Sequence, residues 1–203
     1  MNHYSVDLMF SPSHVAGLSS LLGSPNFIVT LLKACNLSIL YSSLFLPLFP
    51  RSIFFTSFLL ILSLPVSAAS ITTIISDRHS NTSLPDPVRG GSLLPPQHPF
   101  RLFSHPEAYI PILPAFGLIS DILSKFSQCI ILGRDSMLIA LLIIGPLGCI
   151  VRGHHTFMVG FDIDTRAYHT SVTTITAIPT AIKTMNRLAP IRSGRSSSTT
   201  TLF

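Results

Sequence analysis

Two long uncharged stretches constrain this chain more than any other feature. Leu8 to Leu32 and Ser52 to Ser76 each contain 25 residues without a single Asp, Glu, Lys or Arg. A helix needs about 20 mostly apolar residues to cross the roughly 30 Å hydrocarbon core of a membrane. Both stretches are therefore predicted to form membrane-spanning helices.

The overall composition also favours a membrane protein. Apolar residues make up 47% of the 203 residues, charged residues only 10%, and the mean hydropathy is +0.57, whereas soluble domains carry about 25% charged residues. The 13 basic residues outnumber the 8 acidic ones and give a net charge of +5. They are spread along the chain without a cluster, so we expect no nucleic-acid partner. Three scattered cysteines exclude a disulfide scaffold.

Turn and breaker residues divide the chain after the second stretch. Pro85-Asp86-Pro87, Arg89-Gly90-Gly91 and Pro95-Pro96 indicate an extramembrane loop over residues 77–99. Three shorter apolar runs follow, and the connection from Lys33 to Pro50 contains prolines. We expect an all-α fold, a polytopic transmembrane bundle forming a single partial domain over 1–203 with a disordered tail at 193–203. Its five spanning helices are expected near 12–33, 52–76, 104–125, 134–152 and 167–186.

Ionisable residues inside apolar runs are informative because each is costly in a membrane unless it meets a partner or a wet cavity. His105 and Tyr109 are four residues apart and share a face of a helix, while Glu107, the only Glu of the chain, points elsewhere. His154 and His155 end the fourth run, and their side chains diverge by about 100° on a helix. The three imidazoles are ligands that suit copper, zinc or iron.

Plainer interpretations of the same residues remain open. His105 is also typical of a helix start beside a proline, and Glu107 of an interfacial carboxylate. Tyr109 fits an interface anchor, and Lys183 a lysine that reaches the membrane surface with its ammonium group. Spacing alone does not choose between these interpretations.

Taken together, the motifs resemble subunit I of the mitochondrial haem-copper cytochrome c oxidases. The similar stretches occur in the family's order and at closely similar separations, over about residues 5–193. They are Leu62-Ser63-Leu64-Pro65-Val66, Asp77-Arg78 with Asn81-Thr82, Gln97-His98, His105-Pro106-Glu107 with Tyr109, His154-His155, Asp162 to Tyr168, and Ala177-Ile178-Pro179-Thr180 with Lys183.

The resemblance implies a set of site residues. His105, His154 and His155 would bind the copper called CuB, and Tyr109 would be cross-linked to His105. Glu107 would end one proton path. Lys183, with Thr180 one turn before it, would belong to a second path that leads towards Tyr109. The family reduces dioxygen to water with electrons from cytochrome c and moves protons across the membrane.

The resemblance also implies partners and a location. These are the other oxidase subunits, cytochrome c acting through one of them, dioxygen and membrane lipid, in the mitochondrial inner membrane. Quinol is an alternative electron donor, and the sequence of this chain does not distinguish it from cytochrome c. The family's haem ligands lie outside the residues of this chain, so we assign no haem ligand and expect the isolated chain to lack oxidase activity.

Several positions depart from the family in one direction. Arginine stands where the family has tryptophan at Arg51, Arg101, Arg152 and Arg187, and the chain has no Trp at all. A single C-to-U change in each codon would restore tryptophan, which suggests the translation of an unedited organellar gene. A decaying pseudogene is the competing interpretation. In either case the chain could be a membrane-inserted remnant without bound metal.

Overall fold

The structure, a computed structural model, describes residues 4–34, 46–80, 82–92 and 94–193. Every regular element in these ranges is helical, which confirms the all-α fold. The expected tail falls almost wholly outside the described residues, as does most of the connection from Lys33 to Pro50. The long helices are α1 (Tyr4–Ala34), α3 (Leu48–His79), α4 (Leu94–Ser127), α5 (Arg134–Val151) and α6 (Ile163–Ser193), with the 3-10 helices η1 (Pro87–Arg89) and η2 (Arg152–Val159).

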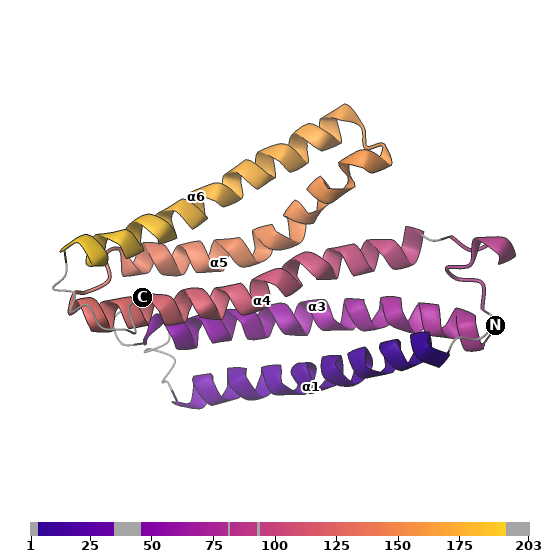
Figure 1. Ribbon diagram of the computed structural model, residues 1–203, viewed down its shortest axis with the longest axis horizontal. Coiled ribbons are helices and arrows are strands. Elements are labelled where there is room, and N and C mark those ends of the chain that lie inside the picture. Colours follow the sequence, from indigo (N-terminus) through magenta and orange to yellow (C-terminus); the bar gives the residue numbers. More distant parts are fainter. Residues whose placement is uncertain (1–3, 35–45, 81, 93, 194–203) are drawn as a thin grey trace.

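The long helices pack in the order of the sequence (Figure 1). α1 lies on α3, α3 on α4, α4 on α5 and α5 on α6. α5 and α6 lean away from α3 and α4 towards the end that carries η2. All the long helices except α5 extend beyond the expected ranges, and α4 already begins at Leu94, so part of the stretch expected as a loop is helical.

Four segments are long and apolar enough to cross a membrane, by length and composition. They are Tyr4–Lys33, Leu48–His79, His105–Ser127 and Arg134–His155. α6 is not among them, because threonines and serines lower its hydropathy. Many large apolar side chains point outwards, among them Leu62, Ile139 and Ile178. Such an exposed apolar surface suits contact with lipid.

The interior joins α3, α4 and α5. Leu59, Leu113, Leu141 and Ile144 form its core cluster, and Tyr109 packs against them. Small polar side chains are also buried, as is common between membrane helices because small residues let backbones approach. At Gly117, an added Cβ would lie only 2.8 Å from the Cα of Phe49. Glycine therefore sets the close contact of α3 with α4.

Candidate functional site

His105 and Tyr109 lie one turn apart on α4 and face α5. Their rings meet edge to face, with centroids 4.7 Å apart and planes at 64°. Both rings pack on Gly148 of α5, where an added Cβ would lie 2.7 Å from Cδ2 of Tyr109 and 3.5 Å from Cδ2 of His105. Gly148 therefore leaves the space that the phenol ring occupies.

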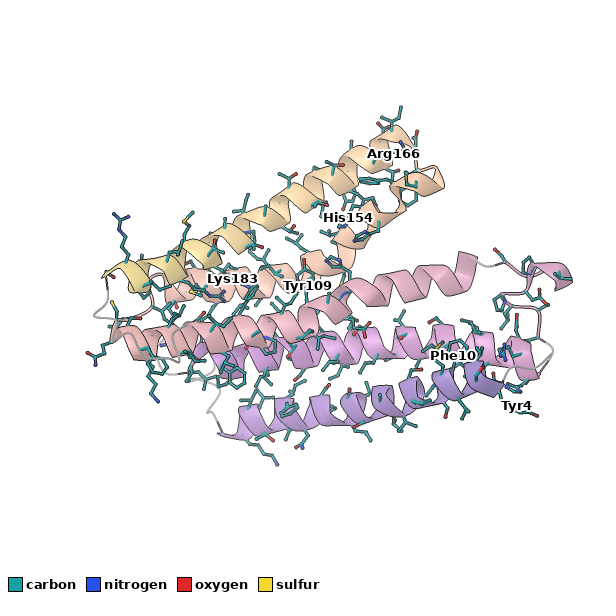
Figure 2. The ribbon with its side chains drawn as sticks, viewed as in Figure 1. Tyr4, Phe10, Tyr109, His154, Arg166 and Lys183 are labelled. Atoms are coloured by element: carbon teal, nitrogen blue, oxygen red, sulfur yellow. The ribbon has the colours of Figure 1, made fainter. Side chains whose placement is uncertain are left out.

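His154 and His155 belong to η2, which continues directly from α5. Their ring centroids are 4.0 Å apart, and the ring of His154 lies 6.1 Å from that of His105. Figure 2 shows Tyr109 and His154 close to each other where α5 passes into η2. The structure thus brings Tyr109, His105, His154 and His155 into one continuous row of rings.

Thr173 of α6 indicates which nitrogen of His154 carries hydrogen. Its Oγ1 lies 3.3 Å from Nδ1 of His154 and donates its single hydrogen to the carbonyl of His169 at 2.7 Å. Oγ1 therefore accepts from Nδ1, and the lone pair of the neutral ring is on Nε2. A histidine that binds a metal usually donates its other N–H in this way.

The row of imidazoles does not surround a common point. No three His, Cys, Asp or Glu side chains in the described ranges are grouped closely enough to hold a metal ion. The donor set still fits copper in its chemistry, because imidazole nitrogen is a ligand that copper accepts. His155 is exposed, so it is the imidazole that would have to turn inwards to complete a three-nitrogen site.

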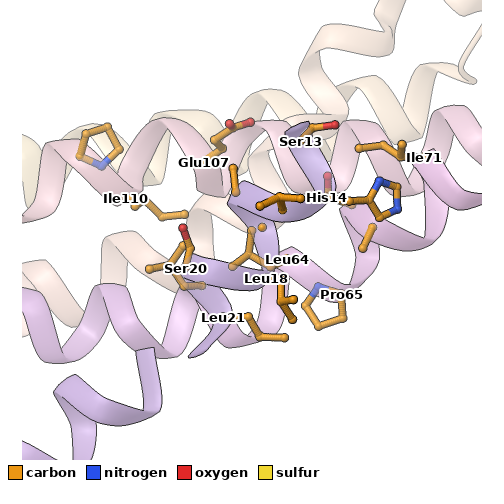
Figure 3. Close-up of a pocket in the computed structure, with 17 residues that line it drawn as sticks. Ser13, His14, Leu18, Ser20, Leu21, Leu64, Pro65, Ile71, Glu107 and Ile110 are labelled. Atoms are coloured by element: carbon orange, nitrogen blue, oxygen red, sulfur yellow. The ribbon is translucent and has the colours of Figure 1, made fainter. Parts of the chain in front are cut away.

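Glu107 lies apart from these rings. It lines an open groove of about 750 Å³ between α1, α3 and α4, together with Ser13, His14 and Ser20 of α1 (Figure 3). The side chains on the groove walls are mostly apolar. The structure therefore separates the carboxylate of Glu107 from the face of α4 that carries His105 and Tyr109.

Lys183 is the largest of the fully buried side chains, with 1% of its surface exposed. Its Nζ lies 4.8 Å from the ring centroid of Phe116 and makes no hydrogen bond to any described residue. Thr180 is exposed, and its hydroxyl donates to the carbonyl of Thr176 at 3.0 Å. The structure therefore buries the lysine between α4 and α6 but leaves Thr180 on the outside of α6.

Arg187 lies next to Lys183 on α6 and shares the same aromatic neighbour. Its Cζ is 4.6 Å from the ring centroid of Phe116, its Nε donates to Oγ of Ser120 at 3.1 Å, and its terminal nitrogen donates to the carbonyl of Phe116 at 2.7 Å. Two cations therefore meet one phenylalanine ring. A cation near an aromatic face contributes about 0.5–2 kcal/mol, depending on its desolvation.

Sequence reasoning missed three residues that shape this region, namely Gly148, Thr173 and Phe116. Thr173 is one of many threonines and serines on α6, so no local pattern distinguishes it. Gly148 could be suspected only as a glycine inside an apolar helix. The contact of Phe116 with α6 depends on tertiary packing that no local pattern encodes.

The fold and these contacts define a polytopic helical membrane protein with a row of imidazoles beside a phenol and, separately, a buried lysine. Residues 3–203 match the family described as Cytochrome C and Quinol oxidase polypeptide I. The chain is 45% identical over 190 residues to cytochrome c oxidase subunit 1 of Candida albicans and 44% identical over 188 residues to that of Pecten maximus. It is also 44% identical over 190 residues to that of Yarrowia lipolytica.

These alignments cover 92–94% of the chain but only 35–39% of each relative, so the chain spans little more than a third of their length. The chain belongs to the family of cytochrome c and quinol oxidase polypeptide I, which is a family of oxidoreductases.

Proposed function

We propose that this chain is part of the catalytic subunit of a cytochrome c oxidase, which reduces dioxygen to water with electrons from cytochrome c and translocates protons. The family membership of residues 3–203 supports this proposal. The row of rings from Tyr109 to His155, where α4, α5 and η2 meet, is the structural observation that favours it.

His105, His154 and His155 would hold copper, the metal called CuB. When bound, copper supplies the redox chemistry of dioxygen reduction. The chain contributes the surroundings: Thr173 orients the ring of His154, and Gly148 makes room for the phenol of Tyr109 beside His105. A phenol fixed one turn from a ligand is placed to exchange a proton close to the site.

Glu107 and Lys183 would serve two separate proton routes. Glu107 faces the groove between α1, α3 and α4, whereas Lys183 lies between α4 and α6. Ionisable groups inside membrane segments commonly mark proton pathways, because isolated charges are expensive there. Thr180, which is exposed here, would join the route of Lys183 only if another segment or subunit covered α6.

The complete subunit would be a multi-pass protein of the mitochondrial inner membrane. Its partners would be the other oxidase subunits, lipid, dioxygen and cytochrome c, which delivers electrons through another subunit. Haem would be bound by segments outside this chain, since no haem ligand is assigned within it. We therefore expect purified chain alone to consume no oxygen with reduced cytochrome c.

Copper binding is the direct test of the proposal. The chain, purified from membranes and loaded with copper, is expected to retain about one metal ion per chain, and the His154→Ala variant is expected to lose it. His169→Ala is the matched control, because His169 stacks on Phe161 outside the row of rings. Retention by His154→Ala, or no retention by the unaltered chain, would reject the proposed site.

A membrane-inserted remnant without metal is the second candidate. Two observations favour it. The imidazoles do not surround one point, and a second cation lies beside Lys183. Sequencing the transcript separates two origins of such a chain. Editing is expected to place Trp codons at positions 51, 101, 152 and 187, while a pseudogene would give a transcript identical to the gene.

A further inference from the structure

α1 is attached to the bundle chiefly through α3. Much of its surface is exposed, including Leu8, Val15, Leu18 and Leu22. α1 and α3 approach at the end that carries Asp7 and diverge towards the end near Ala34 (Figure 1). α1 also forms one wall of the groove that Glu107 lines.

The first polar attachment of α1 is the carboxylate of Asp7. Its Oδ1 accepts from Nε of Arg78 at 2.7 Å, and its Oδ2 lies 3.2 Å from Nε2 of His79. Arg78 keeps its charge at every relevant pH, because guanidinium does not lose its proton in proteins. His79 adds a second ion pair only when its imidazole is protonated.

The second attachment is the ring of His14, which faces an oxygen atom on each side. Nδ1 lies 3.2 Å from the carbonyl of Phe10, which can only accept, and Nε2 lies 3.1 Å from Oγ1 of Thr72 on α3. The Thr72 hydroxyl donates to the carbonyl of Ala68 at 2.7 Å. With that hydrogen committed, both contacts of His14 are satisfied only when both ring nitrogens carry hydrogen.

We propose that protonation of His14 and His79 draws α1 onto α3 and narrows the groove, so that the two histidines form a pH-sensitive clasp. The charged groups that face them are Asp7 on α1, Arg78 on α3 and Glu107 of α4 across the groove, whereas the carboxylate of Asp77 accepts hydrogen bonds from the following loop. Acid adds a proton to each imidazole, so acid tightens the clasp and alkali loosens it. The clasp is independent of the copper site.

The absence of tryptophan provides a clean probe of the groove. Leu21 lines the groove (Figure 3), so Leu21→Trp places the only indole of the chain there. In vesicles that contain brominated lipid, an open groove exposes this indole to quenching. Quenching is expected to be about two- to fivefold stronger at pH 8.5 than at pH 5.5, the range that one partly exposed ion pair can produce.

Variants assign the effect to the clasp. In the Leu21→Trp background, His14→Gln with His79→Gln is expected to abolish the pH dependence, and Asp7→Asn to reduce it while keeping the helices intact. His169→Gln is the matched control and is expected to leave it unchanged. Quenching that does not depend on pH, or a pH dependence that persists in the double variant, would overturn the proposal.

Discussion

The carboxylate of Asp121 on α4 accepts a hydrogen bond from the backbone N–H of Phe49, 72 residues earlier in the chain, at 3.0 Å. Its other oxygen accepts from the N–H of Leu48 at 3.3 Å. The N-cap residue of α3 is Pro47, which makes no side-chain cap. Asp121 therefore caps α3 from a neighbouring helix, and its negative charge also suits the positive end of the helix dipole.

Removal of this cap is expected to destabilise the chain. Asp121→Ala leaves two N–H groups without their acceptor and should lower the free energy of unfolding by about 1–3 kcal/mol. Asp121→Asn keeps one acceptor oxygen, so the decrease in its free energy of unfolding should be about half as large. Unfolding of the purified chain in lipid micelles, followed by circular dichroism, measures both values. Equal stability of Asp121→Ala and the unaltered chain would show that the cap contributes nothing.

Gly148 and Gly145 form a matched pair on α5. An added Cβ at Gly148 would lie 2.7 Å from the ring of Tyr109, whereas at Gly145 the nearest atom is a side-chain carbon of Leu59 at 3.6 Å. Gly148→Ala is thus expected to push the phenol from His105 and to cost about 1–3 kcal/mol, typical of overpacking. Gly145→Ala should be close to neutral. Thermal unfolding of both variants measures the stability, and the NMR chemical shifts of the Tyr109 ring report its displacement. Equal stability and equal shifts in the two variants would contradict the contact of Gly148 with Tyr109.

The helical bundle could be predicted from the sequence because uncharged runs of sufficient length report directly on membrane helices. Their ends could not, since α4 begins within a stretch rich in proline that local rules assign to a loop. Pro95 and Pro96 fall in the first turn of α4, where a missing N–H leaves no intrahelical hydrogen bond unmade. Helix ends therefore depend on surroundings that a sequence pattern does not contain.

The candidate site was predictable only in part, for a related reason. The shared face of His105 and Tyr109 follows from helical geometry alone. The contacts of Phe116 with Lys183 and Arg187 depend on how α6 lies against α4. No sequence pattern indicates a role for Asp121, because its cap on α3 joins two helices far apart in the chain.

Asp77 organises the loop that follows α3. Its Oδ1 accepts from the N–H of Leu84 at 3.0 Å, and its Oδ2 from the N–H of Asp86 at 2.9 Å. In Asp77→Ala, the amides of Leu84 and Asp86 should exchange hydrogen at least about tenfold faster, which corresponds to about 1.4 kcal/mol of lost protection. Mass spectrometry of exchanged peptides measures this. Asp164→Ala, an exposed carboxylate in the first turn of α6, is the control, and unchanged exchange in Asp77→Ala would refute the role.

Position 187 gives a structural test of the proposal that tryptophan replaces arginine after editing. An indole at this position could stack on Phe116 and donate its N–H to Ser120, as the guanidinium of Arg187 does, while removing the cation beside Lys183. Arg187→Trp is expected to raise the free energy of unfolding by about 0.5–1.5 kcal/mol, the range of an aromatic pair.

Arg187→Gln separates the two contributions at position 187, because it removes the charge without supplying a ring. If stacking on Phe116 matters, Arg187→Gln should have a lower free energy of unfolding than Arg187→Trp. If the cation beside Lys183 is the main destabilising feature, both variants should have a higher free energy of unfolding than the unaltered chain. Chemical unfolding of the three chains in the same micelles gives the comparison. An Arg187→Trp variant that is less stable than the unaltered chain would argue against tryptophan as the residue that this position accommodates.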